Sequence, residues 1–209
     1  MSDKMKPLQN ALENLVLNTA KAAYPLEVAE LKKQLEIADD DTTHDEQLEK
    51  TIKAVTEQFE HDTGLKLTNE TWTYTLDRFG GDYIIIPIRP IQSITWIKYY
   101  DSANAQQTLP TSIYALDGAT GTVPAGNSRI LLKYNQDWPT TTDRYDAVEI
   151  KFVTGYGAAA TAVPQSLKQA LLLLAVFYFE HRGEPISEAL AGYPAYEHLV
   201  RRFIRQSYP

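Results

Sequence analysis

Apolar residues recur along the chain with two different periods, and the period changes twice. Up to about residue 63 they recur every three to four positions, which is the spacing of amphipathic helices. From Thr68 to Val153 they recur at every second position, as they do in half-buried strands. A helical period returns after Pro164. The pattern therefore predicts helices at both ends of the chain and a β module between them.

One helix of the first part is predicted over about 44–63, because four apolar residues share a single helical face: Leu48, Ile52, Val55 and Phe59. The run Thr43-His44-Asp45-Glu46 has the residue types and spacing of a capping box at its start. Gly64 is placed to end this helix in a left-handed conformation. Two shorter helices are predicted before it, one over 7–20 and one beginning with Pro25 at its first helical position.

The middle part carries six predicted strands, separated by residues that favour turns. Large apolar side chains alternate with threonines around Tyr74, as expected for a strand with one buried face. Pro87 and Pro90 cannot lie inside a central strand, so they separate two of the strands. Asp101 to Asn104 has the composition of a turn. The predicted strands cover 71–76, 83–86, 94–100, 113–116, 129–133 and 147–153.

The predicted helix from Pro164 to Arg182, with Gly183 as its stop, is apolar on almost every side. Its uncharged run, 170–179, is shorter than the roughly 20 apolar residues that a bilayer-spanning helix needs. It also lacks the polar face of an ordinary surface helix, so protein must cover most of its sides. Candidates for packing between subunits are Leu172, Leu173, Val176, Phe177 and Phe179.

A final helix is predicted from about Pro194 to Gln206, with apolar residues on one side and three arginines on the other. Three arginines on one helix face are consistent with a solvated surface. They are also consistent with a contact, because Arg and Tyr are enriched at protein interfaces. The candidates for this contact are Arg201, Arg202, Arg205 and Tyr208.

The negative charge of the chain is concentrated at its start. Residues 1–62 hold 14 acidic and 7 basic residues and so carry the whole formal net charge of −7. This acidic part argues against a surface that binds nucleic acid, which is usually basic. It fits either a solvated pair of helices or a partner with a basic face. The first residues lack the apolar run of a secretory signal, so we expect a protein made in the cytoplasm.

We find no constellation of residues that indicates catalysis or metal binding. The chain has no cysteine, its four histidines lack the spacing of metal ligands, and Asp39-Asp40-Asp41 lacks the glycine of a calcium loop. Gly155-Tyr156-Gly157 is too short for a dinucleotide loop and is more typical of a turn out of the sheet. We therefore expect no enzymatic activity, no cofactor and no metal.

The expected fold class is α+β, with a bundle of N- and C-terminal helices that carries an inserted antiparallel β module. Residues 1–24 are expected to form an extension or arm, residues 25–66 and 158–209 a helical core domain, and residues 67–157 the inserted β domain. Tyrosine and tryptophan are frequent in the β module. They indicate sheet packing or, as the alternative function, a β-rich module on helices that binds carbohydrate or peptide.

From about Leu26 to Arg182 the chain resembles the head–tail connector (adaptor, head-completion) proteins of tailed bacteriophages. The resemblance lies in the order and spacing of several pieces rather than in any one of them. These pieces are residues 35–41, Thr63-Gly64, residues 70–79, residues 88–94, Gln136-Asp137-Trp138-Pro139, residues 148–157, residues 163–170 and Glu180-His181-Arg182.

The resemblance implies a structural virion protein that forms a ring below the portal, joins the DNA-filled head to the tail and helps retain the genome. By family expectation it is a twelvefold homo-oligomer at the head–tail junction, assembled in the host cytoplasm, with no membrane involved. Its neighbours would be the portal protein and the next neck or tail-completion protein, and packaged DNA would pass through the channel without specific binding.

On this view, the arginines and the tyrosine of the C-terminal segment would contact the portal. The β module would contact the next subunit or the tail-side protein through its loops, at Gly80, Gly81, Asp117 and Gly118.

Overall fold

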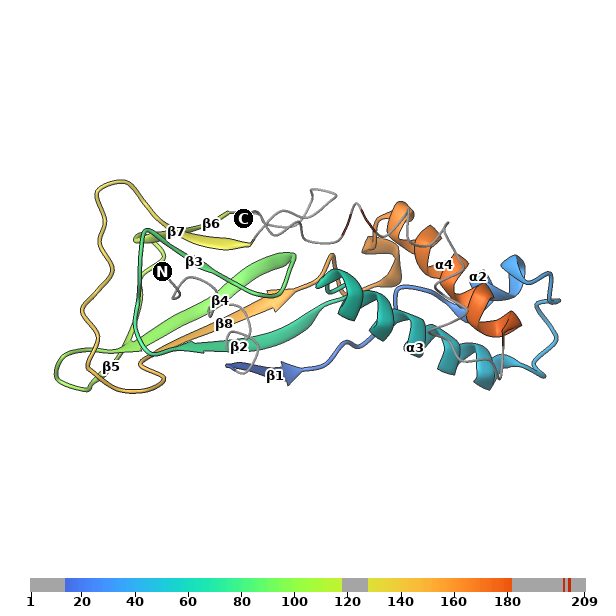
Figure 1. Cartoon of the computed structure of the whole chain (residues 1–209), viewed down its shortest axis with the longest axis horizontal. Coiled ribbons are helices and arrows are strands. Elements are labelled where there is room, and N and C mark those ends of the chain that lie inside the picture. The colour runs from blue at the N-terminus through green and yellow to red at the C-terminus, as the bar shows by residue number, and fades with distance from the viewer. Residues whose placement is uncertain (1–13, 118–127, 182–200, 202, 204–209) are drawn as a thin grey trace, which may run out of the picture. The chain divides into compact units, whose positions relative to one another are not determined.

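The structure, a computed structural model, describes residues 14–117, 128–181, 201 and 203 (Figure 1). The described residues fall into two compact units. The β unit lies within residues 1–20 and 69–155, and the helical unit lies within residues 21–68 and 156–209. The helices and the antiparallel sheets confirm the α+β class that the sequence predicts.

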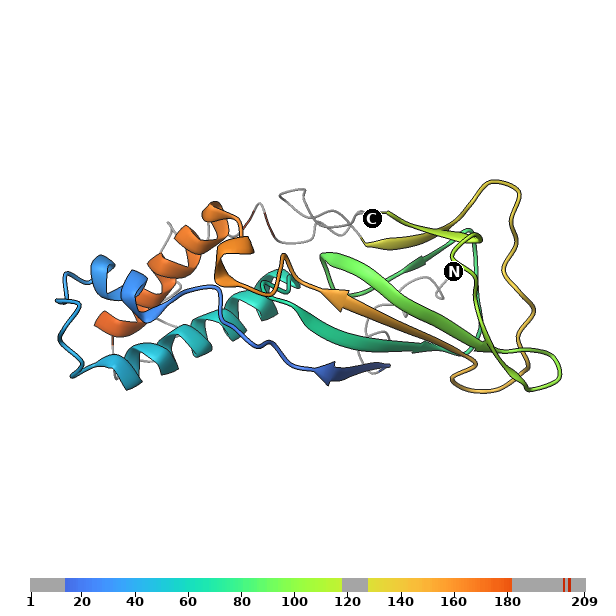
Figure 2. The ribbon, with the colours of Figure 1, turned by 180° about the vertical axis from the view of Figure 1, so that it is seen from behind.

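Three α-helices lie in the described part of the helical unit and pack against one another: α2 (Val28–Gln34), α3 (Asp45–Thr63) and α4 (Gln165–Glu180) (Figure 2). The predicted helix 44–63 is confirmed as α3, and the four apolar residues of its predicted face are all buried. Gly64 ends the helix with φ 66°, and its N–H donates to the Glu60 carbonyl. None of the described helices is both long enough and apolar enough to span a membrane.

Two predicted helix starts are wrong. The N-cap of α3 is His44, not Thr43, because the Thr43 N–H donates to Asp41 Oδ1 at 2.9 Å in the preceding turn. Helix α2 begins at Val28, so Pro25 does not occupy its first position. The backbone N–H of Glu27 donates to Glu30 Oε2 at 3.0 Å and fixes this later start.

The prediction of a helix over 7–20 is wrong where the structure describes it, since Leu15–Thr19 is strand β1. It pairs antiparallel with β2 (Glu70–Leu76), and the Thr75 N–H donates to the Asn14 carbonyl at 3.1 Å. Local apolar spacing favoured a helix. Pairing of β1 with β2, however, satisfies backbone N–H and C=O groups along β2 that a helix would leave unpaired. Residues 7–13 lie outside the described part of the chain.

Where the structure describes it, the β unit consists of two antiparallel sheets. The larger has the order β1-β2-β8-β4-β5, where β4 is Ile91–Tyr100, β5 is Gln106–Thr108 and β8 is Val148–Thr154. The smaller has the order β3-β7-β6, formed by Tyr83–Ile85, Arg129–Leu132 and Tyr114–Asp117. All six predicted strands are present, and β1 and β5 are additional. As predicted, the chain turns out of the sheet after β8, where Gly155 takes φ 99°.

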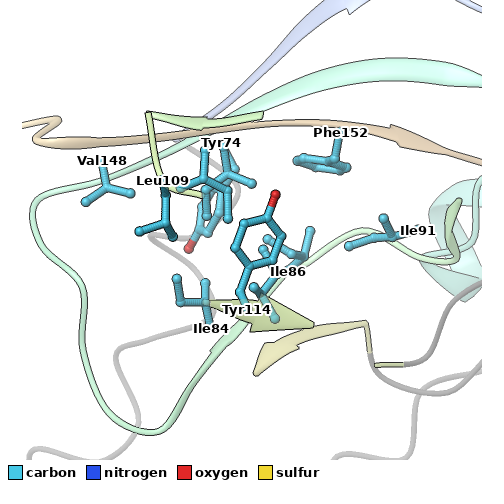
Figure 3. Close-up of a cluster of buried hydrophobic side chains, with 11 residues drawn as sticks. Tyr74, Ile84, Ile86, Ile91, Leu109, Tyr114, Val148 and Phe152 are labelled. Carbon is cyan, nitrogen blue, oxygen red and sulfur yellow. The ribbon is translucent and has the colours of Figure 1, made fainter. Parts of the chain in front are cut away.

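The inner faces of the two sheets enclose the core of the β unit (Figure 3). Tyr74, Ile91 and Phe152 come from the large sheet, while Ile84 and Tyr114 come from the small one. Full burial of an aliphatic or aromatic side chain of this size contributes about 1.5–3 kcal/mol relative to exposure. The core therefore leaves the outer face of each sheet, and the sheet edges, for contact with solvent or with other proteins.

Candidate functional site

The described residues contain no group of three or more acidic or histidine side chains that could hold a metal ion. A hollow of about 380 Å³ lies beside the end of β2 and is lined by Asp77, Arg78, Thr141, Thr142 and Asp143. None of the residues predicted from the sequence lines it. Those that the structure describes lie on α4, in or next to the small sheet, and near the C-terminus.

Helix α4 gathers four of the five predicted packing residues on one side. Leu172, Leu173, Val176 and Phe179 are all half-buried, and at 3.6 residues per turn they span about 120° of the helix surface. The fully buried residues of α4, such as Leu171 and Leu174, point the other way, toward the rest of the helical unit. We call Leu172, Leu173, Val176 and Phe179 the α4 stripe.

The fifth predicted packing residue, Phe177, does not belong to the α4 stripe. Its side chain is buried, and its ring stacks on His181 with centroids 4.2 Å apart. Phe179 lies at the end of the stripe, where its ring meets His44 edge-on at 5.8 Å. Because His44 caps α3, this contact fixes the end of the stripe against the neighbouring helix.

Buried lysines tie the three helices together in pairs. Lys168 of α4 lies 2.6 Å from Glu30 of α2, and Lys32 of α2 lies 2.6 Å from Asp45 at the start of α3. Burial raises the pKa of Glu30, but the hydrogen bond from Lys168 and its backbone hydrogen bond at Glu27 outweigh burial and lower it below the ordinary value. The α4 stripe therefore lies on a helix whose position is fixed by charge as well as by packing.

A further buried charge, Glu60 of α3, has three partners. Its side chain is 4% exposed, and its oxygens lie 2.7 Å from Lys21 Nζ and 3.0 Å from Lys66 Nζ. The Leu67 N–H also donates to this carboxylate, at 3.1 Å. The Leu67 carbonyl in turn accepts from the Tyr156 N–H. Glu60 thus anchors the places where the chain enters and leaves the helical unit.

The outer face of the small sheet carries exposed apolar side chains beside half-buried charged ones. Tyr83 and Ile85 of β3 are exposed, and their direct partners on β7 are Leu131 and Arg129. The Arg129 guanidinium lies 5.5 Å from the Tyr83 ring centroid and donates to Asp117 of β6. Tyrosine and arginine are both enriched at protein interfaces.

The predicted loop residues border this same sheet, at its two ends. Gly80 and Gly81 precede β3 and are exposed, and the Gly81 carbonyl accepts from Trp138 Nε1 at 2.9 Å. Asp117 ends β6, level with the other end of β3, and β7 lies between these two strands. The structure therefore separates these residues by the length of the sheet. Gly118 lies outside the described residues.

The predicted C-terminal helix lies mostly outside the described part of the chain, and so do Arg202, Arg205 and Tyr208. Arg201 is described, is helical and is exposed. Phe203 is fully buried, and its ring lies 6.3 Å from that of Phe59 on α3. Phe203 therefore packs into the helical unit, while Arg201 lies at the surface.

Sequence reasoning missed the buried ion pairs. The only available signal was Lys168, the one charged residue of α4 before its last position, Glu180. Nothing in the sequence distinguishes Glu60 from the other acidic residues of α3, since its partners Lys21 and Lys66 come from loops. The exposed apolar residues of β1 and β3 were not predicted either.

Comparison with known proteins gives one family and several structures. The model of the head completion protein family matches residues 26–192. A chain from the virion of a native gene transfer agent (GTA) particle is 25% identical, with a TM-score of 0.75 and coverage of 93% of this chain and 97% of that one. No curated protein matches this chain.

Two further similar chains come from the necks of GTA particles and show the same fold. One, from an empty particle computed with C6 symmetry, is 24% identical with a TM-score of 0.73. The other, from a native particle computed with C12 symmetry, is 24% identical with a TM-score of 0.67. Both matches cover 93% of this chain and 97% of the other.

Proposed function

Because the chain belongs to the head completion protein family, we propose that it is a structural, non-enzymatic protein of the virion neck, located at the head–tail junction. The observation that carries this proposal is the extent of the likeness. The family match runs from before α2 to beyond α4, and the likeness to a GTA virion chain covers 93% of the chain. Both the helical unit and the β unit are therefore included.

We propose that twelve copies form a ring below the portal, join the DNA-filled head to the tail and help retain the genome. The necks that contain similar chains were computed with C6 and C12 symmetry, which supports an assembly of repeated copies. Interfaces in such rings are head-to-tail, so each copy must present two different surfaces to its neighbours.

The α4 stripe is the proposed packing surface between copies in the helical unit. Its four side chains are half-buried and apolar. They belong to α4, which α2 and α3 hold in place. Clustered apolar residues on a surface mark contacts with other proteins more often than scattered ones do. Phe177, which is buried within its own copy, supports the stripe from behind rather than crossing the interface.

We propose a division of the chain into the predicted domains, in which the arm adds strand β1 to the large sheet. Residues 25–66 and 158–209 are proposed to form one helical bundle, residues 67–157 an inserted β domain and residues 1–24 an arm. The contact between Phe203 and Phe59 supports a bundle that includes both N- and C-terminal residues.

The loop between α2 and α3 supports a channel through which packaged DNA passes without specific binding. Asp39, Asp40 and Asp41 are all exposed, and hydrogen bonds from Thr43 lower the pKa of Asp41 below its ordinary value. Carboxylates that stay ionised repel phosphate. A surface of this kind would line a DNA passage without gripping the duplex.

For the axial neighbours, we propose that Arg201, Arg202, Arg205 and Tyr208 contact the portal protein. The exposure of Arg201 beside the buried Phe203 supports an outward-facing arginine side. We propose that Gly80, Gly81, Asp117 and Gly118, in the loops of the small sheet, contact the next subunit or the next neck or tail-completion protein.

Replacing Arg201, Arg202 and Arg205 together by glutamate is expected to abolish docking to portal-bearing capsids, since each contact would become a repulsion. The measurement is co-sedimentation of the purified chain with capsids that lack tails. The matched control replaces Lys33, Lys50 and Lys53, which are exposed in the helical unit, by glutamate. Equal docking of the two variants would remove the portal proposal.

A variant without Gly80 and Gly81 should dock to capsids but fail to recruit tails. Normal tail joining by this variant would remove the loop proposal.

The neck role itself predicts a copy number. Quantitative peptide mass spectrometry of purified particles should find about twelve copies of this chain per particle, as expected for one closed ring. The major capsid protein serves as the internal standard. Absence of the chain from particles would overturn the proposed function, and hundreds of copies would indicate a shell or tail-tube component instead.

A further inference from the structure

The large sheet has two edge strands, β1 and β5. Among the described residues, β1 pairs only with β2, and β5 pairs only with β4 (Figure 1). Val16 and Leu17 of β1 are 56% and 44% exposed, and all three residues of β5 are exposed. Each open edge presents a row of backbone N–H and C=O groups to any strand that can approach.

Neither edge carries the charges that usually protect such a strand. The sequence of β1 is Leu-Val-Leu-Asn-Thr and that of β5 is Gln-Gln-Thr. All charged residues of this sheet lie on its three inner strands: Glu70, Lys98, Glu149 and Lys151. Soluble proteins normally place lysine, glutamate or proline on edge strands, because these residues oppose pairing with other chains. The reversed distribution indicates edges that another strand covers in the assembled state.

The directions of the strands identify which edges can meet. Every pair in the order β1-β2-β8-β4-β5 is antiparallel, so β1 and β5 run in the same direction at opposite edges of one sheet. Two copies that join through β1 alone form a closed twofold dimer and stop. Joining β5 of one copy to β1 of the next uses two different surfaces, and the contact can repeat around a ring.

We propose that β5 of one copy pairs in parallel with β1 of the adjacent copy, so that neighbouring large sheets are joined by backbone hydrogen bonds. The occupant of each open edge is therefore a second copy of this chain, added by strand pairing. The regular part of the β1 edge is Leu15 to Leu17, because the register with β2 shifts after Leu17. This inference rests on the proposed ring and names an interface within it that is separate from the α4 stripe.

Thiol crosslinking tests this pairing directly, because the chain has no cysteine of its own. The variant carries Val16→Cys on β1 and Thr108→Cys on β5, both at exposed positions. Within one copy these strands are four strand spacings apart, about 19 Å. A bis-maleimide of about half that span cannot join them in one chain but tolerates a small difference in register between copies. Purified particles are treated with it and analysed on a denaturing gel.

The expected result is a ladder of covalent multimers. Val16→Cys combined with Thr73→Cys is the matched control, because these residues are directly paired within one sheet and should give monomers with an internal crosslink. Monomers alone from the Val16/Thr108 variant would overturn the proposal. Dimers from the Val16→Cys single variant would also overturn it, since they would show that β1 pairs with β1.

A charge on the edge provides a second, independent test. Val16→Lys should lower the copy number in particles at least about tenfold relative to Ser93→Lys, which places lysine at an exposed position of the inner strand β4. Equal copy numbers would overturn the pairing. If only the strand pairing is wrong, the unmodified chain will still be found in particles at about twelve copies. If the neck role is wrong, the unmodified chain will be absent from them.

Discussion

Val176→Asp is expected to reduce incorporation of the chain into particles by about a hundredfold or more. Val176 lies at the centre of the α4 stripe and is half-buried within its own copy. If the stripe packs against a second copy, the carboxylate becomes buried there without a partner. That costs several kcal/mol at each interface, and each 1.4 kcal/mol corresponds to a tenfold change in binding. A ring repeats the cost at every contact.

The measurement counts the chain against the major capsid protein in purified particles, and the thermal unfolding of the free chain serves as the test of folding. Ala54→Asp is the matched control, because Ala54 is exposed on α3 in the same helical unit. Both variants should unfold close to the wild-type temperature, whereas Val176→Asp alone should be missing from particles. Normal incorporation of Val176→Asp would show that the stripe faces solvent in the neck.

The elements that the sequence predicted best are those whose type and ends are determined by their own residues. Four apolar residues form one face of α3, and Gly64 supplies the left-handed conformation that ends the helix. The strand around Tyr74 was equally readable, because its alternation reflects one face packed on the core. Such signals are local, so a single sequence contains them.

The elements that the sequence did not reveal depend on distant residues. Strand β1 exists because β2 offers an edge to pair with, and the three polar residues of β5 carry no apolar pattern at all. The capping box failed for a related reason, since Asp41 accepts the Thr43 N–H and shifts the helix start by one residue. Tertiary pairing and local turns overrode propensity in these three places.

The candidate site shows the same division. The apolar character of α4 was evident in the sequence, but only the structure separates the four residues of the stripe from Phe177, which faces its own unit. The loop residues around Gly81 and Asp117 were chosen as turn signals. The exposed Tyr83 and Ile85 lie on the sheet between them and could not be distinguished from core residues by pattern alone.

Glu60→Gln is expected to destabilise the chain by about 3–5 kcal/mol, because it removes the charge from a buried carboxylate that faces two lysines. Glutamine nearly preserves the volume, so the loss would come from removing the negative charge that Lys21 and Lys66 face. For a chain of this length, 1 kcal/mol shifts the unfolding midpoint by about 2–4 °C, which predicts a fall of about 6–20 °C.

Glu46→Gln provides the matched control on the same helix. Glu46 pairs with Lys50 at 2.6 Å, but the two side chains are 83% and 72% exposed. Solvent screens an exposed pair of this type, so its loss should shift the midpoint far less than the loss of the Glu60 charge does. Thermal and urea unfolding followed by far-UV circular dichroism would measure both variants. If Glu60→Gln unfolded no earlier than Glu46→Gln, the buried anchor would contribute nothing. If Glu60→Gln unfolded at a much lower temperature, the places where the chain enters and leaves the helical unit would depend on this one carboxylate. The same carboxylate accepts the Leu67 N–H.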